Sequence, residues 1–495
     1  MDERVFGDLD GWDPRPLRQS LAKAGFMASH LEALGFGSVA SIQSDAGLVE
    51  HEFEDGDPLG TAIRLFLLAQ EVEVDPALRL LGVELSSLCE LGLLEAKGGK
   101  VAARFQLSPQ AEGWVVSDFL SRQHHGEGDY VMGVGPSSRL LAALISGRGR
   151  GRFLELGCGV GWLSGRFCHE GWQVTASDLN ARALDLAKFN ARLAGVDGIE
   201  WVKSDLFAGL KGRKYDRIAA NLPYVQSPGG SLMFREAPEG EEGICLRALR
   251  SLNDHLETGG LAVALIHWCH SNDDDWRERP LQVIPEDGVR RWLFQSDCAG
   301  PGEYARRWLR GDPRFRGAAL GVEFERWMKF YRERGIHRIS SGFVVLQACE
   351  QGEEWSETDS RAAGGIQMGA GEELRRIFDN RSWLRQVSEN LLDLAFRPAA
   401  GIHAEMQMQL QGAHWQRRTI RLTSPGKLAY DGQIDENLMR LLELFGQGRT
   451  GGEMVAELRQ RADFARQPGL EEEVSELVRQ LLRYGLLEVP TEKSR

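Results

Sequence analysis

Glycine and acidic residues follow two apolar runs of this chain in a way that suits a nucleotide-like ligand. The run Phe153–Leu156 contains Glu155 and leads into a turn with three glycines, Gly157, Gly159 and Gly161. Glycine tolerates positive φ and adds no side chain, so such a turn lets backbone N–H groups approach a polar ligand. The turn alone is weak support for a site, because similar turns occur where nothing binds. The residues downstream therefore carry more weight.

Two aspartates follow the next two expected strands. Asp178 ends the run Val174–Ser177, about 20 residues after the first glycine, where a doubly wound fold places the acid that accepts hydrogen bonds from the ribose hydroxyls. A helix cap is the alternative role for Asp178, although Asn180 suits that role too. Asp205 follows the expected strand Trp201–Lys203. Both acids are expected at the carboxyl ends of their strands.

A fourth expected strand, Arg217–Ala220, leads to Asn221-Leu222-Pro223-Tyr224. In isolation this tetrapeptide is typical of an ordinary turn before proline. After three preceding signals at regular intervals, we interpret it as part of the same site.

Together these residues resemble the class I S-adenosylmethionine-dependent methyltransferases, over about residues 129–347. The resemblance implies that the Glu-x-Gly-x-Gly-x-Gly turn holds the methionine part of the cofactor. It also implies that Asp178 binds the ribose and that Asp205 contacts the adenine amino group. The expected cofactor is S-adenosyl-L-methionine, and the expected cofactor residues are Glu155, Gly157, Gly159, Gly161, Asp178, Asp205 and Asn221.

The Asn-Leu-Pro-Tyr motif resembles the (Asn/Asp/Ser)-Pro-Pro-Tyr signature of methyltransferases that act on planar amino or amide nitrogens. Leucine at its second position is best known from rRNA adenine dimethyltransferases. Such a nitrogen is a poor nucleophile because its lone pair is delocalised. If the Asn221 side-chain oxygen and the Leu222 or Pro223 carbonyl accept its two N–H groups, the lone pair turns toward the methyl donor. Tyr224 would stack on the planar group, so the expected catalytic residues are Asn221, Pro223 and Tyr224.

The loop before the glycine turn is similar to one in the "small" domain group of methyltransferases. That group includes ribosomal RNA guanine enzymes and release-factor glutamine enzymes, and its loop covers cofactor and substrate. Here the loop Asp129–Ser138 precedes an apolar helix, Leu140–Ile145. The chain lacks the Arg-Pro-Glu-Thr-Glu stretch of the release-factor enzymes, and this departure weakens that particular assignment.

The expected fold is α/β, a doubly wound Rossmann-like sheet of seven strands with helical, winged-helix-like flanks. Beyond the fourth strand, the sequence predicts a helix over Ile244–Leu256, a strand over Leu261–Ile266 and a closing strand over Ser341–Gln347. We expect three domains, with limits 1–125, 126–350 and 365–495. The flanking domains are expected to be winged-helix-like because a helix runs into similar endings, Gly92-Leu93-Leu94-Glu95 and Gly485-Leu486-Leu487-Glu488.

We expect no catalytic or metal-binding role for the connecting segments and the possible metal ligands. The acidic tract Asp45–Asp57 and the glycine-rich stretch Gly364–Gly371 are expected to be linkers. An insertion that includes Phe234–Ala237 is expected to vary with the substrate. The pair His124-His125, and the cluster of His267, Cys269 and His270, are not expected to bind metal; on a strand His270 faces away from the other two.

Composition limits the classes of function. The 495 residues carry a formal net charge of −13, so no general attraction to nucleic acid is expected, although a local basic groove stays possible. The seven cysteines form no C-x-x-C pair, which fits a reducing compartment, and no run of 18 apolar residues occurs. We therefore expect a cytoplasmic protein without a membrane partner.

The leading hypothesis is an enzyme that N-methylates a macromolecule. The Asn-Leu-Pro-Tyr motif and the winged-helix flanks favour a base in RNA or DNA, whereas the acidic charge favours a protein amide such as glutamine. The alternatives are a methyltransferase-like core that only binds or regulates, and a small-molecule methyltransferase. The oligomeric state is left open.

Overall fold

The computed structural model describes residues 5–36, 42, 47, 51–120, 122, 128–147, 150–229, 243–271, 275–310, 312, 314–361, 365–461 and 464–489. The chain forms two compact units. One comprises Met1–Leu141 with Gly149–Ala362, and the other comprises Ala142–Arg148 with Ala363–Arg495. Part of the acidic tract, the beginning of the glycine-rich linker, His124-His125 and the insertion Phe234–Ala237 lie outside the described residues.

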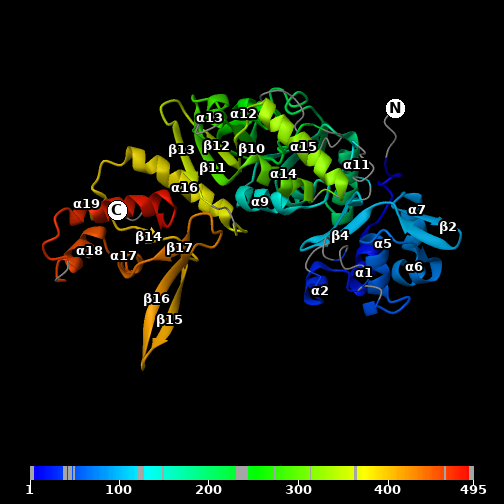
Figure 1. Ribbon diagram of the computed structural model, residues 1–495, viewed down its shortest axis with the longest axis horizontal. Coiled ribbons are helices and arrows are strands. Elements are labelled where there is room, and N and C mark those ends of the chain that lie inside the picture. Colours follow the sequence, from blue (N-terminus) through cyan, green and yellow to red (C-terminus); the bar gives the residue numbers. More distant parts are fainter. Residues whose placement is uncertain are drawn as a thin grey trace. The chain divides into compact units, whose positions relative to one another are not determined.

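An eight-stranded mixed sheet organises the first unit, in the order β13-β11-β12-β10-β9-β6-β7-β8. Figure 1 labels β10, β11, β12 and β13 of this sheet. Strands β6 to β10 are parallel, and β12 runs antiparallel to both of its neighbours, β10 and β11. The strands are β6 (Arg152–Leu156), β7 (Gln173–Asp178), β8 (Glu200–Lys203), β9 (Tyr215–Ala220), β10 (Leu256–His270), β11 (Val289–Ala299), β12 (Arg338–Ala348) and β13 (Trp355–Ser360).

The expected count of seven strands differs from this sheet by one, β13. Its sequence Trp355-Ser-Glu-Thr-Asp-Ser360 is polar and gives no apolar signal, yet it pairs in parallel with β11. Its anchors are the buried ring of Trp355 and a hydrogen bond of 2.6 Å from the Trp292 indole to Asp359. A half-exposed edge strand needs few apolar residues, and for this reason the hydrophobic pattern of the sequence did not predict β13.

Helices cover the sheet and fix where its strands end. Helix α11 (Ala181–Ala194) begins at Asn180, whose side chain accepts from the Arg182 N–H, and ends at Gly195 in the left-handed conformation. The parallel strands share a buried core with helix α12, in which Leu154 and Ile218 lie with Leu249. The other helices of this half of the chain are α9 (Pro136–Ile145), α10 (Trp162–His169), α12 (Gly243–Leu252), α13 (Glu278–Val283), α14 (Pro301–Arg310) and α15 (Ala318–Glu333).

The N-terminal residues belong to the same compact unit as the sheet. Helix α11 joins them, because Asn190 exchanges hydrogen bonds of 2.7 and 2.9 Å with the Val116 backbone and Phe189 stacks on Trp12. A three-stranded sheet, β1-β3-β2, lies there, with α6 and α7 between β1 and β2 in the chain. The elements are α1 (Arg15–Lys23), α2 (Ala28–Ala33), α5 (Pro58–Phe66), β1 (Val72–Glu73), α6 (Val74–Leu81), α7 (Glu84–Glu90), β2 (Leu94–Lys97), β3 (Lys100–Ala103), β4 (Gln106–Gln110) and β5 (Gly113–Ser117).

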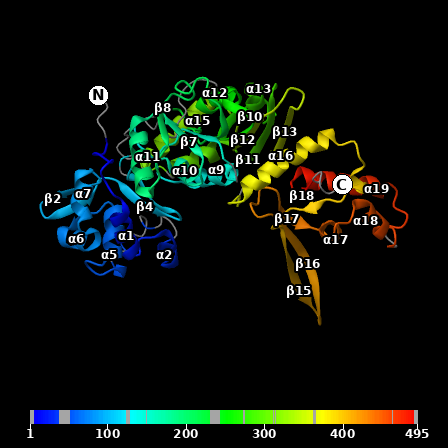
Figure 2. The same cartoon turned by 180° about the vertical axis from the view of Figure 1, so that it is seen from behind.

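The second unit packs helices around its own core and carries a long hairpin, β15–β16 (Figure 2). Buried Glu373 ties the unit together, since its carboxylate accepts from the N–H groups of Gly426, Leu428 and Ala429. Its elements are α16 (Ala370–Gln386), β14 (Arg397–Pro398), β15 (His403–Gln411), β16 (His414–Thr423), β17 (Asp431–Ile434), α17 (Glu436–Gly446), α18 (Gly451–Leu458), α19 (Leu470–Arg483) and β18 (Leu487–Glu488). Among the described residues of both units, no helix is long and apolar enough to cross a membrane.

Candidate functional site

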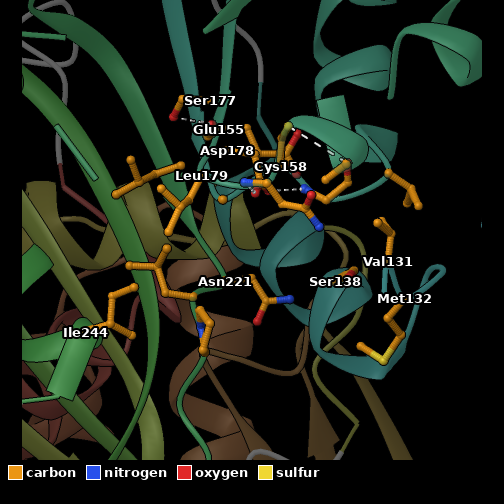
Figure 3. Close-up of a pocket in the computed structure, with 18 of the residues that line it drawn as sticks. Val131, Met132, Ser138, Glu155, Cys158, Ser177, Asp178, Leu179, Asn221 and Ile244 are labelled. Carbon is orange, nitrogen blue, oxygen red and sulfur yellow. Dashed lines mark hydrogen bonds between the residues drawn. The ribbon is translucent and has the colours of Figure 1, made fainter. Parts of the chain in front are cut away.

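A cavity of about 220 Å³ lies at the carboxyl ends of β6, β7 and β9 (Figure 3). Parallel strands bring the residues that follow them to one edge of a sheet, which is why signals far apart in sequence meet here. Eight of the residues singled out from the sequence line this cavity: Glu155, Gly157, Gly159, Asp178, Asp205, Asn221, Pro223 and Tyr224.

The glycine turn is fixed by backbone hydrogen bonds to β7. The N–H groups of Gly157 and Cys158 both donate to the Ser177 carbonyl, at 2.8 and 2.9 Å. Gly157 and Gly159 have φ of 74° and 50°, and a Cβ at Gly159 would meet open space. The turn therefore leaves room for a ligand beside its backbone.

Gly161 is not among the residues that line the cavity. It begins helix α10 with a φ of 69°, and a Cβ there would lie 2.7 Å from the Cβ of Ala187. Such a distance is too short for two carbon atoms. The requirement for glycine at this position comes from the packing of α10 against α11.

Asp178 lies at the end of β7 and points its carboxylate at the turn. One oxygen accepts from the Gly159 N–H at 2.9 Å, and the other accepts from the Asn180 N–H at 2.8 Å. Burial raises the pKa of this carboxyl above its usual range. Asn180 caps α11, which is the role that the sequence left open between the two residues. Each carboxylate oxygen keeps a lone pair for a further donor.

Glu155 lies under the turn and is bound to the beginning of α10. Its carboxylate accepts from the Ser164 N–H at 2.8 Å and from the Ser164 hydroxyl. Burial raises the pKa of Glu155 to about 8, against the effect of the two Ser164 hydrogen bonds. Glu155 therefore couples the floor of the cavity to the helix that follows the turn.

Asp205 occupies a more open position at the cavity. Its carboxylate lies 3.6 Å from the Arg247 guanidinium, and both side chains are about half exposed. An ion pair of this kind contributes little to stability. Asp205 is consequently available to a ligand.

Only one of the two polar atoms of the Asn221 side chain has a hydrogen-bond partner among the described residues. Its amide nitrogen donates to the Ser137 hydroxyl at 3.2 Å, whereas its buried side-chain oxygen has no hydrogen-bond partner among the described residues. The Pro223 carbonyl already accepts from the Cys245 thiol at 3.3 Å. A carbonyl oxygen has two lone pairs and a thiol is a weak donor, so the Leu222 and Pro223 carbonyls both stay candidates for the second acceptor.

A buried aromatic network supports the motif from behind. The Tyr224 ring lies 4.4 Å from the His267 ring, centroid to centroid, and the His267 Nδ1 is hydrogen-bonded to the Tyr304 hydroxyl at 2.6 Å. The Tyr304 hydroxyl accepts from the Gln226 N–H, and the Tyr331 hydroxyl donates to the Gln226 carbonyl. Burial lowers the pKa of His267 to about 3, so its ring stays neutral near pH 7.

Sequence reasoning missed this network. It considered His267 and Cys269 only in relation to a metal site, which it did not expect, and gave them no other role. The Cys269 thiol donates to the Gln226 side chain at 3.4 Å. No group of three metal-ligating side chains occurs within the described part of the chain. The spacing of His267, Tyr304 and Tyr331 gives no signal, because only the fold brings them together.

The loop after the N-terminal strands forms another wall of the cavity. Val131 donates its N–H to Asp118 at 2.7 Å, and the Asp118 carboxylate forms a buried ion pair with Arg182 of α11. Asn180 adds a hydrogen bond of 3.0 Å to the Asp129 carbonyl. The sequence predicted that this loop covers the site, but not that Asp118 and Arg182 hold it there.

A second cavity, of about 1070 Å³, shares Pro223 with the first. The buried Ser227 hydroxyl belongs to its lining and has no hydrogen-bond partner among the described residues. Its charged lining is balanced, with three arginines and three acids: Arg250, Arg279, Arg334, Asp275, Glu278 and Glu333. The cavity thus adjoins the Asn-Leu-Pro-Tyr motif and carries both signs of charge.

Three family models match the chain. Residues 132–239 match the methyltransferase small domain. Residues 37–104 and 375–489 match two domains of unknown function, DUF7059 and DUF7782. The matched methyltransferase segment begins in the covering loop and extends beyond Tyr224, so it includes the glycine turn and all three strand-end motifs.

Curated relatives resemble the central part. A ribosomal protein uL3 glutamine methyltransferase of Xanthomonas campestris pv. campestris is 34% identical over 154 residues, which cover 29% of this chain and 48% of that protein. A protein of the same name from Xylella fastidiosa strain Temecula1 is 29% identical, with 50% of this chain and 81% of that protein covered. The ribosomal RNA small subunit methyltransferase C of Escherichia coli strain K12 is 32% identical, with 26% and 34% covered. This chain thus spans about half the length of the first of these relatives.

Proposed function

Because the chain carries a class I S-adenosylmethionine-dependent methyltransferase domain of the small-domain group, we propose that it N-methylates a planar amino or amide nitrogen of a macromolecule. The observation that carries this proposal is at Asn221, a residue of the cavity lining whose side-chain oxygen is buried and has no hydrogen-bond partner among the described residues. A buried acceptor without a donor costs about 1–3 kcal/mol, so a donor from a ligand is expected there. An N–H group of the acceptor substrate would satisfy it.

The cavity suits the cofactor in its shape and in its hydrogen-bonding groups. The open space beside Gly159 leaves the backbone of the turn accessible to the methionine part. Asp178 would bind the ribose hydroxyls through its remaining lone pairs, and Asp205 would accept from the adenine amino group. S-adenosylmethionine supplies an electrophilic methyl group when bound. We assign no cofactor contact to Gly161, which caps α10 and is not among the residues that line the cavity.

The residues around Asn221 would orient the acceptor nitrogen. Its two N–H groups would donate to the Asn221 side-chain oxygen and to the Leu222 or Pro223 carbonyl, so that the nitrogen lone pair faces the methyl group. Hydrogen bonds of this kind also stabilise the positive charge that develops on the nitrogen, and one such contact contributes about 10²–10³ in rate. Tyr224 would stack on the planar group, in a position that His267 maintains.

The second cavity favours a polypeptide as the acceptor over a nucleic acid. Its position beside Pro223 suits the residues that flank the methylated nitrogen. Grooves that bind a phosphate backbone are positively charged along their length, whereas this lining pairs three arginines with three acids. The overall charge of −13 supports the same choice. A nucleic-acid base is the second candidate, supported by the ribosomal RNA methyltransferase among the relatives.

The domain limits are proposed as 1–125, 126–350 and 365–495. Support for a winged-helix-like N-terminal domain comes from the order of α5, β1, α6 and α7 before the hairpin β2–β3. In the C-terminal part, α19 leads into β18, which pairs with β14. A cytoplasmic location is supported by the seven cysteines, all of which are free.

Transfer of radiolabelled methyl groups tests the proposal. A cell lysate is incubated with labelled cofactor and either the wild-type chain or Asn221→Ala, and protein, RNA, DNA and small molecules are separated. We expect label in protein, only with the wild-type chain. Label in RNA with a steep salt dependence would establish the second candidate instead. A chain that fails to bind the cofactor at all would support the non-catalytic alternative, and label in small molecules would exclude a macromolecular acceptor.

A further inference from the structure

The β15–β16 hairpin extends away from the helices of its unit (Figures 1 and 2). One face of its outer part carries large exposed apolar side chains. The register places Met406 opposite Ile420 and Leu410 opposite Trp415, so these side chains share a face of the sheet. Ile420 is only 3% exposed. Beyond it the same face continues with four large apolar side chains that are 47–66% exposed, Met406, Met408, Leu410 and Trp415, and with Arg417, which pairs with Met408. We call the four apolar residues the apolar strip.

The charges near the strip are already neutralised or turned away from it. Arg417 forms an ion pair of 2.6 Å with Glu436, and Arg421 forms one of 2.7 Å with Asp431. On the opposite face Thr419 donates to Gln407 and Arg418 donates to Gln409. A cationic platform for nucleic acid is therefore not what this hairpin offers, and apolar contact is the interaction left to it.

The outer edge of β15 is open for pairing. The strand order is β15-β16-β17, and β17 reaches only residues 420–423 of β16, so the outer hairpin is a two-stranded ribbon. Such a ribbon is marginally stable in water without a further strand or a packed face. Proteins usually protect a free edge with lysine, proline or inward charges. The nine residues of β15 contain no proline and one charged residue, Glu405.

The sequence of β15 is chemically symmetric about Met408. Reading outward from this residue, Gln407 matches Gln409, Met406 matches Leu410, and Glu405 matches Gln411. In an antiparallel pair of two identical strands with a two-fold axis at Met408, apolar residues would face apolar residues on one side of the sheet. Glutamines would face polar residues on the other side, and no like charges would meet.

We propose that β15 pairs antiparallel with β15 of a second copy of this chain, about a two-fold axis at Met408. The two hairpins form a four-stranded sheet in which the apolar strips of both copies are continuous. The new strand stabilises the ribbon, and the edge hydrogen-bonding groups of β15 are satisfied. This inference is independent of the proposed methyltransferase activity, since it rests on the hairpin alone.

A cysteine at the axis tests the register. In Met408→Cys the two new thiols lie directly opposite each other, where Cα atoms of paired residues are about 4.5–5.5 Å apart, within the range that a disulfide spans. We expect Met408→Cys to give a covalent dimer on mild oxidation. Gln416→Cys on β16 should form no covalent dimer and should migrate as a monomer in denaturing electrophoresis without a reducing agent. A mixture of Gln407→Cys and Gln409→Cys chains is expected to give mostly mixed dimers. Cross-linking at Gln416→Cys as efficient as at Met408→Cys would refute the register.

The oligomeric state tests the proposal without any new thiol. Light scattering of the full chain over a range of concentrations is expected to show a dimer for the wild type and a monomer for Met408→Arg, which places two cations at the axis. Gln416→Arg is the matched control on the other strand and is expected to stay dimeric. A monomeric wild type, or a dimer that survives Met408→Arg, would overturn the proposal. Cofactor affinity, measured by calorimetry, should be equal in all three proteins, which separates a failed dimer from a misfolded chain.

Discussion

The two ends of the central cavity are built in different ways. At the end where we propose that the cofactor binds (the cofactor end), the glycine turn, Asp178 and Asn180 are joined by hydrogen bonds between residues close to two neighbouring strands. At the end proposed for the methyl acceptor (the acceptor end), the Asn-Leu-Pro-Tyr loop is supported by side chains from distant segments, chiefly His267 and Tyr304. The first end depends on backbone geometry that a short motif specifies, and the second depends on the packing of the whole unit.

Because of this difference, we expect substitutions at the two ends to affect cofactor affinity and turnover separately. Changes at the cofactor end should lower cofactor affinity, because the lost contacts are present before any reaction. Changes at the acceptor end should lower turnover and leave cofactor affinity intact, because the lost contacts orient the nitrogen in the transition state. Variants at the two ends test whether this division holds.

The largest effect is expected from Asp178→Ala. The substitution removes both proposed ribose contacts and the acceptor of the Gly159 N–H, and charge-assisted hydrogen bonds contribute about 1.5–3 kcal/mol each. Cofactor affinity should fall by about 10²–10³ or more in calorimetry. Asp205→Ala is the matched control: its half-exposed carboxylate should cost less than tenfold. Equal affinity of Asp178→Ala and the wild type would contradict the ribose assignment.

Asn221→Ala should have the next largest effect, at the acceptor end. Loss of the side-chain oxygen should reduce kcat by about 10²–10³, because one acceptor of the nitrogen N–H groups disappears. Cofactor affinity should change by only a few-fold. Single-turnover methyl transfer and calorimetry on the same preparation measure both quantities. If affinity fell as far as turnover did, Asn221 would belong to the cofactor end.

Much of the cofactor end was predictable from the sequence. Apolar runs, glycines and acids at regular intervals are local signals, and Glu155, Gly157, Gly159, Asp178 and Asp205 all reach the predicted cavity. Gly161 is the exception at this end. Its spacing fits the motif, but the contact with Ala187 that requires glycine involves a helix that the motif does not contain.

The acceptor end and the sheet edge were less predictable. The motif itself identified Asn221 and Tyr224, but not His267 and Tyr304, which reach the loop through β10 and α14. The parallel strand β13 is polar, so hydrophobic periodicity gave no sign of it. Both cases depend on contacts between segments far apart in the chain, and the sequence pattern of each segment alone does not encode its partner.

A further variant, Glu155→Gln, tests how burial affects the carboxyl group beneath the cofactor end. The unfolded carboxyl titrates near 4.5 and the folded one at about 8, so the folded state binds a proton more tightly. The stabilising effect of the proton is complete below pH 4.5 and is lost as the pH rises through 8, by about 1.4 kcal/mol per pH unit between the two values. Compared with Glu155→Gln, the wild type should lose about 2–3 kcal/mol of stability between pH 5 and pH 7.

Denaturant unfolding at the two pH values measures this effect. The chain has two compact units, so the relevant transition is the one that added cofactor shifts. A difference between wild type and Glu155→Gln that does not change with pH would show that the buried carboxyl is ionised throughout. In that case the two hydrogen bonds from Ser164 would outweigh the effect of burial on the pKa of Glu155.

The smallest effect is expected from Tyr304→Phe, which probes the support behind the acceptor end. The variant keeps the ring but removes the hydroxyl that joins the Gln226 N–H to His267, a hydrogen bond with a net contribution of about 1 kcal/mol. We expect kcat to fall by up to about tenfold, with cofactor affinity unchanged. Gln226 follows Tyr224 by two positions, so a looser loop would misplace the Tyr224 ring relative to Asn221.

Tyr331→Phe removes the other hydrogen bond to Gln226 and should lower kcat in the same way. The loss of kcat in the double variant should be smaller than the product of the two separate losses, because both hydroxyls hold the same residue, Gln226. A purely structural role predicts a lower melting temperature without any change in kcat; a lower kcat at unchanged cofactor affinity would instead show that the packing behind Tyr224 positions the acceptor.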